Sequence, residues 1–120
     1  MNNELVQLIT DLGETRDKSG FLNGNDEKVV EIFAGIKSVN RSEYYEALRA
    51  NLEVTKIFVV DPDDFELSAA EVEIDGRTRT IRASFIEYEG VRYRIQRQYL
   101  VPTTGRLELT CAEVEAYGSV

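Results

Sequence analysis

The chain has 120 residues, of which 42% are hydrophobic and 30% charged, and its formal net charge is −8 at pH 7. It contains no histidine and a single cysteine, which removes the commonest general base and metal ligand and excludes an internal disulfide. Composition therefore favours one domain over residues 1–120, with no enzymatic activity and no cofactor, and the acidic balance argues against binding to nucleic-acid phosphates.

No apolar run approaches the roughly 20 residues that a membrane-spanning helix needs. The first residues, Met1 to Glu4, lack the basic start and apolar core of a signal peptide. We expect a protein that is made in the cytoplasm and has no membrane partner.

The first half of the sequence predicts strands and one helix. Residues 4–10 are apolar-rich but too few for periodicity to separate a strand from a helical turn. Residues 13–26 are rich in Gly, Asn and Asp, which predicts a loop or an open hairpin. Alternating apolar residues predict a strand over residues 27–39, and Asn40 is a suitable N-cap for a helix that continues to about Leu52.

The second half predicts strands joined by short turns. A β-branched run over residues 54–60 stops at Asp61-Pro62, and an acidic loop follows over residues 61–70. Strands are predicted over residues 71–75 and 78–88, with Asp75-Gly76 as a hairpin turn between them and a bulge or bend near Phe85.

Two more strands complete the pattern, over residues 91–99 and 107–111, with a turn at residues 102–105 between them. The sequence thus predicts a mainly β fold: a small antiparallel barrel-like sheet with one short helix packed on it. Cys111 lies in the last alternating strand, so we expect it to be a small core residue.

Arg97 stands on an otherwise apolar face of the strand over residues 91–99. A buried charge needs a partner, and Glu108 on the following strand is the nearest carboxylate, with Glu43 as the alternative. We predict an Arg97–Glu108 ion pair that fixes strand register.

Three segments together resemble the head-tail connector family of long-tailed phages and prophages, the small proteins that close the head or join it to the tail. The first two are Asp17-Lys18-Ser19-Gly20, and Lys37-Ser38-Val39 with Arg41-Ser42-Glu43-Tyr44-Tyr45 and Ala47. The third is the hairpin Tyr88-Glu89-Gly90-Val91-Arg92-Tyr93-Arg94-Ile95-Gln96-Arg97-Gln98-Tyr99, followed by Leu107-Glu108-Leu109-Thr110-Cys111. The match covers residues 17–47 and 88–111; the long region between them departs from the family pattern.

The resemblance implies a structural virion protein at the head-tail junction. Such a protein would join the portal end of the filled capsid to the tail, with a portal or adaptor protein and tail-completion proteins as partners. It would be a monomer when isolated and a homo-oligomeric ring in the virion, through which DNA passes without specific binding. An acidic ring suits this role, because like charge keeps DNA from adhering to the wall.

Five residues are candidate contacts for the ring or a partner. Lys37, Arg41 and Tyr45 flank the apolar face of the predicted helix, and Tyr and Arg are common in interface hot spots; a solvated helix face is the alternative. Phe65 and Leu67 are apolar residues in the acidic loop, where they could anchor a partner, narrow the channel, or pack back onto the barrel.

Other functions remain open at this stage. A tail-completion or terminator protein shares the size and β content. A small carboxylate-dependent enzyme or a metal-binding domain is opposed by the missing histidine and the missing ligand spacing. The acids between Asp61 and Glu66 lack the glycine of a calcium loop.

Overall fold

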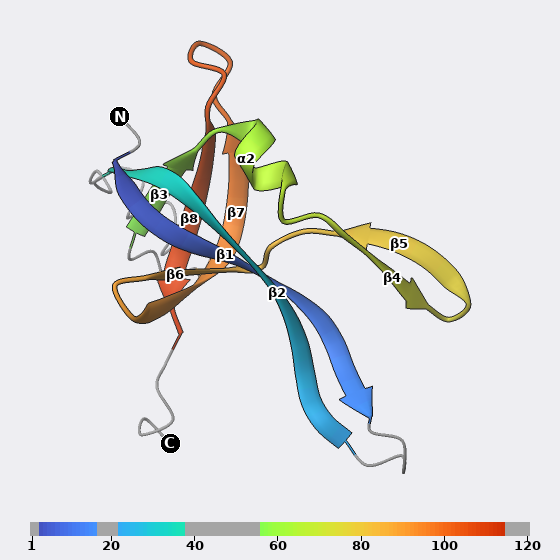
Figure 1. The fold of residues 1–120 in the computed structure, drawn as a ribbon. Helices are drawn as coiled ribbons and strands as arrows, with labels where there is room; N and C mark the ends of the chain where they lie inside the picture. Colours follow the sequence, from blue (N-terminus) through green and yellow to red (C-terminus); the bar gives the residue numbers. More distant parts are fainter. Residues whose placement is uncertain (1–2, 17–21, 38–55, 115–120) are drawn as a thin grey trace, which may run out of the picture.

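The computed structural model describes residues 3–16, 22–37 and 56–114, which form a closed antiparallel barrel, a short helix and a separate hairpin (Figure 1). This confirms the predicted fold class. The helix predicted from Asn40 to about Leu52 lies outside the described residues. In chain order the elements are β1 (Glu4–Arg16), β2 (Leu22–Lys37), β3 (Lys56–Val60), α2 (Pro62–Glu66), β4 (Ala70–Ile74), β5 (Arg77–Ile81), β6 (Phe85–Tyr88), β7 (Val91–Leu100) and β8 (Leu107–Glu113).

Six strands close the barrel in the order β1, β2, β3, β8, β7 and β6. The order closes on itself because β1 pairs with β2 on one side and with β6 on the other. Leu5 pairs with Phe33 of β2, and Leu8 pairs with Ile86 of β6. All of these pairings are antiparallel. Closure gives each barrel strand a neighbour on both sides, although β1 meets β6 only over residues 7–9 and β2 meets β3 only over residues 35–37.

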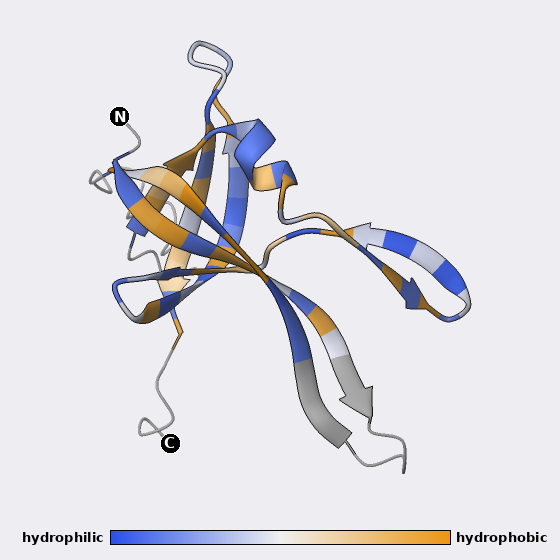
Figure 2. Ribbon diagram, viewed as in Figure 1, coloured by the Kyte–Doolittle hydropathy of each residue, from blue (hydrophilic) through white to orange (hydrophobic). Residues whose placement is uncertain are grey.

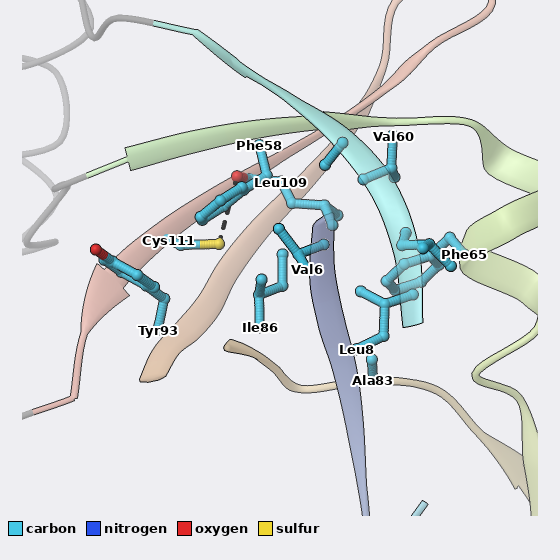
Figure 3. Packing of buried hydrophobic residues seen from close by; sticks show 12 residues of the cluster. Val6, Leu8, Phe58, Val60, Phe65, Ala83, Ile86, Tyr93, Leu109 and Cys111 are labelled. Carbon is cyan, nitrogen blue, oxygen red and sulfur yellow. Dashed lines mark hydrogen bonds between the residues drawn. The ribbon is translucent and has the colours of Figure 1, made fainter. Parts of the chain in front are cut away.

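The core lies inside the barrel and is built from alternate residues of the strands (Figure 3). Phe58 of β3 is fully buried and meets the rings of Tyr88 and Tyr93 edge-on, at centroid distances of 5.9 and 5.5 Å. Such edge-to-face contacts suit the charge distribution of aromatic rings. The remaining fully buried apolar core residues include Val6, Leu8, Val60, Ile86, Leu109 and Cys111.

α2 occupies the segment predicted to be an acidic loop, so that prediction is wrong. The Asp61 side chain accepts a hydrogen bond from the Asp63 backbone N–H at 2.8 Å, which caps the helix, and Pro62 occupies its first turn. Proline is well suited to this position because its missing N–H has no partner there in any helix. The proline therefore ends the preceding strand and also starts a helix.

The chain just after α2 is fastened to the barrel. Thr10 is fully buried and donates its hydroxyl to the Ser68 carbonyl at 2.7 Å, while the Ser68 hydroxyl accepts from the Ala83 backbone N–H at 3.0 Å. Lys28 donates to the Ala69 carbonyl at 2.7 Å. Buried hydrogen bonds of this kind fix position as well as contributing stability.

The strand predicted over residues 78–88 is interrupted at residues 82–84, close to the predicted bend. The Ser84 N–H donates to the carbonyl of Ile9, and the Ser84 carbonyl accepts from the N–H of Ile95. Before the interruption the chain belongs to the separate β4–β5 hairpin, and after it to the barrel.

Two hairpins extend beyond the barrel (Figure 1). One is the far half of β1 and β2, in the region predicted as a loop or open hairpin; the other is β4–β5. The molecule accordingly measures 52 × 36 × 27 Å along its principal axes. No helix within the described ranges is long and apolar enough to cross a membrane.

Candidate functional site

The β4–β5 hairpin is a two-stranded sheet held by a tight turn. Asp75 and Gly76 both have positive φ, 53° and 76°, as the twisted two-residue turns of hairpins require. Glycine adopts this backbone without strain and aspartate tolerates it, which explains why this dipeptide predicts the turn correctly.

The two faces of this hairpin have different chemistry. Directly paired residues share a face, so Val72 lies beside Arg79 and Ile74 beside Arg77. We call this side, completed by Ala70 and Ile81, the arginine face. The opposite side carries only polar residues: Glu71, Glu73, Thr78 and Thr80.

The arginine face is left open by the described part of the chain. Ile74 is 46% exposed, and both arginines are exposed. Figure 2 shows the hairpin standing away from the barrel with hydrophobic and hydrophilic residues mixed along it. A hairpin of two strands is marginally stable alone in water, so an open apolar row on it is suited to contact with another surface.

A second open surface lies on the outside of the barrel. Leu5 pairs with Phe33, Gln7 with Glu31 and Ile9 with Val29, so these side chains share the outer face of β1 and β2. Ile9 is only 2% exposed, so the open part of this face consists of the other five residues, which we call the outer β1–β2 face. Phe33 and Val29 are 57% and 56% exposed, and the Glu31 carboxylate between them accepts a hydrogen bond from Gln7 at 3.1 Å.

Phe65 was a candidate partner anchor, and the structure corrects this interpretation. Its side chain is buried in the barrel core together with Leu8 and Ala83 (Figure 3). The helical turn explains the difference, because it directs Phe65 inward while Leu67, just past the helix end, is 54% exposed. Leu67 remains available for contact, whereas Phe65 does not.

The predicted Arg97–Glu108 pair is also wrong. Glu108 lies 3.5 Å from the Lys37 ammonium, and the Arg97 side chain is exposed. A bulge between Ile95 and Arg97 inserts one extra residue into β7, so that Arg97 pairs with Thr110 on the outside of the barrel. The shift breaks the alternation that placed Arg97 with the apolar residues.

Of the remaining candidates, Lys37 ends β2 and is engaged with Glu108. Arg41 and Tyr45 lie outside the described residues. The structure therefore brings Lys37 and Glu108 together, and of the three predicted contact residues that it describes, Lys37, Phe65 and Leu67, it removes Phe65 from the surface.

Two titratable groups of the barrel, the Cys111 thiol and the Tyr88 phenol, are held in their neutral forms. Burial raises the pKa of the Cys111 thiol to about 12, and the thiol donates a weak hydrogen bond to the Leu109 carbonyl at 3.4 Å. The hydrogen bond from Tyr88 to the Glu4 carboxylate raises the pKa of that phenol to about 12. A thiol in this state is a poor nucleophile, in line with its predicted place in the core.

The densest cationic cluster is occupied by other side chains. Arg92 and Arg94 lie against the ring of Phe85, at 5.5 and 5.3 Å from its centroid. Arg92 also bonds to Glu27 at 2.9 Å and lies 3.7 Å from Glu87. Within the described ranges, no group of three or more acids and cysteines is placed to hold a metal ion.

Sequence reasoning located the β4–β5 hairpin but missed its role as an open surface. The signal was present in its alternation: apolar residues at 70, 72 and 74 face arginines at 77 and 79 across a two-residue turn.

Comparison of the chain with models of known protein families and with curated proteins finds no match.

Proposed function

We propose that this protein is a structural head-closure or head-tail connector of a long-tailed phage or prophage, without catalytic activity and without a cofactor. The proposal rests on the resemblance of residues 17–47 and 88–111 to that family. The structural observation that supports it is a closed barrel from which two hairpins extend. Two faces are open for contact, the arginine face of the β4–β5 hairpin and the outer β1–β2 face of the barrel. A protein that works by contact needs such surfaces more than it needs a pocket.

In this role the protein is made in the bacterial host and acts in the virion, at the junction of head and tail. Its partners are a portal or adaptor protein on the head side and tail-completion proteins on the other. Several copies form a ring around the DNA path, and the net charge of −8 gives the ring a wall to which DNA does not adhere.

Assembly on a template is the step to test. The purified chain is mixed with the portal ring encoded near its gene, and in parallel with the tail-completion protein from the same cluster. We expect the chain to add to the portal ring as a symmetric layer, visible by electron microscopy and native mass spectrometry. Binding to the tail protein alone would favour a tail-completion role, and binding to neither would contradict both.

A matched control uses the same chain without the β4–β5 hairpin. Ser68 and Ala83 are joined by a hydrogen bond, so residues 70–81 leave and re-enter the barrel at one place. A short glycine linker between residues 69 and 82 should therefore preserve the barrel. Loss of portal binding with an intact barrel would assign the contact to the hairpin.

A further inference from the structure

We infer that the arginine face of the β4–β5 hairpin docks on the outer β1–β2 face of a second copy of this chain. This inference rests on the connector function proposed above, since a ring requires a contact between neighbouring copies. It adds the two surfaces that make that contact and the residues that carry it.

Charge complementarity identifies the occupant. The arginine face presents Arg77 and Arg79 beside Val72 and Ile74. The guanidinium groups of these two arginines make no hydrogen bond or ion pair with the described residues, whereas those of Arg82 and Arg92 are paired with Glu66 and Glu27. Arginines beside apolar residues fit a partner that is itself apolar and acidic. A second copy supplies such a partner, because the chain has 22 acidic residues against 14 basic ones.

The outer β1–β2 face has the matching pattern. Along β2 the residues Phe33, Glu31 and Val29 alternate apolar, acidic, apolar, and same-side residues of a strand recur about every 6.6 Å. The arginine face carries its side chains at the same repeat, since it is also a strand pair. Ile74 and Val72 can thus lie against Phe33 and Val29 while an arginine reaches the Glu31 carboxylate.

The contact joins two different surfaces, so it is heterologous. Heterologous contacts close into rings or continue as filaments, depending on the rotation between copies. The area is small, one five-residue strand pair against another, and interfaces of this size are weak on their own. The inference therefore agrees with a monomer in dilute solution and a ring that depends on a template.

Cysteine trapping tests the contact on the full chain. One preparation carries Ile74→Cys and the other Phe33→Cys; the native Cys111 is fully buried and does not compete. When the two are mixed under mild oxidation, the disulfide between them should form about tenfold faster than with Thr78→Cys in place of Ile74→Cys. Thr78 lies on the opposite face of the same hairpin, so it is a matched control.

Charge reversal supplies the second arm. Arg77→Glu with Arg79→Glu should slow the trapping roughly fivefold, and Glu31→Arg in the partner preparation should restore it. These residues are exposed, so circular dichroism should show an unchanged fold. Equal trapping at positions 74 and 78, or no rescue by Glu31→Arg, would overturn the inference.

The trapping uses the purified chain alone, which separates it from the test of function. If the chain adds to the portal ring but shows no preference between positions 74 and 78, the connector proposal stands and this contact is wrong. If trapping succeeds and no portal or tail protein binds, the contact stands and the connector proposal fails.

Discussion

Phe65 and Leu67 are both apolar, but the structure gives them opposite surroundings. Phe65 is 3% exposed and belongs to the core, whereas Leu67 is 54% exposed. We predict that Phe65→Ala lowers the free energy of unfolding by about 3–5 kcal/mol, because it leaves a cavity under α2. Leu67→Ala should change it by no more than about 0.5 kcal/mol.

Urea denaturation of the two variants checks this difference. The neighbouring Leu67 variant controls for any general effect of altering this segment. Similar losses in both variants would contradict the placement of Phe65 in the core.

Cys111 gives a second test at the level of one residue. The folded protein raises the pKa of its thiol from 9.0 to about 12, so it holds the proton more tightly than the unfolded chain does. The resulting stabilisation is complete below pH 9 and is lost as the pH rises from 9 toward 12. We predict that iodoacetamide modifies this thiol only after denaturant unfolds the protein.

A Cys111→Ala variant should show a shallower loss of stability between pH 9 and 12 than the native protein. Tyr88, whose pKa is also raised, titrates in both proteins and therefore cancels in the comparison. The variant also removes the contribution of Cys111 to the raised pKa of Tyr93, so the difference reports the thiol together with this coupling. Rapid modification of the native fold at pH 8 would contradict the burial of the thiol.

Among the elements, the β4–β5 hairpin should be separable from the barrel. It adds no strand to the barrel, and its two ends meet at the hydrogen bond between Ser68 and Ala83. We predict that replacing residues 70–81 with a short glycine linker changes the melting temperature by only a few degrees. Calorimetry of the two proteins measures this shift, and failure of the shortened chain to fold would contradict it.

Amide hydrogen exchange tests the same point without shortening the chain. The amides of β4 and β5 should exchange much faster than those of β3 and β8, because no third strand among the described residues pairs with the hairpin. Equal protection in the two regions would indicate that the hairpin is held by contacts that the barrel itself supplies.

Local signals predicted the elements well where the chemistry is local. Asp75-Gly76 specifies its turn through backbone conformation alone, and the alternation of Leu107, Leu109 and Cys111 correctly places β8 against the core. Pro62 was misread because proline both ends strands and begins helices, and only the cap from Asp61 decides between them.

The errors at the candidate site come from longer-range effects. The β7 bulge depends on pairing with β8 and leaves no mark in the alternation around Arg97, so the predicted ion pair could not be checked from sequence. The open faces of the β4–β5 hairpin and the barrel were likewise not predictable, because exposure depends on what the rest of the chain covers.

For the whole molecule, we predict negligible affinity for duplex DNA at physiological salt. The net charge is −8, and the cluster around Arg92 is already neutralised in part by Glu27 and Glu87. Fluorescence anisotropy with a labelled duplex checks this prediction. Micromolar binding that weakens steeply with added salt would contradict it.

The seam between β1 and β6 has a consequence for the order of events at the ribosome. Tyr88 reaches back to Glu4 across 84 positions of sequence, and β1 meets β6 over Gln7, Leu8 and Ile9 only. At typical rates of synthesis, the first strand waits on the order of several seconds for its second neighbour. During that interval β1 and β2 can be joined by β3 but not by β6, so barrel closure is a late event and its rate should be limited by the long loop that it completes.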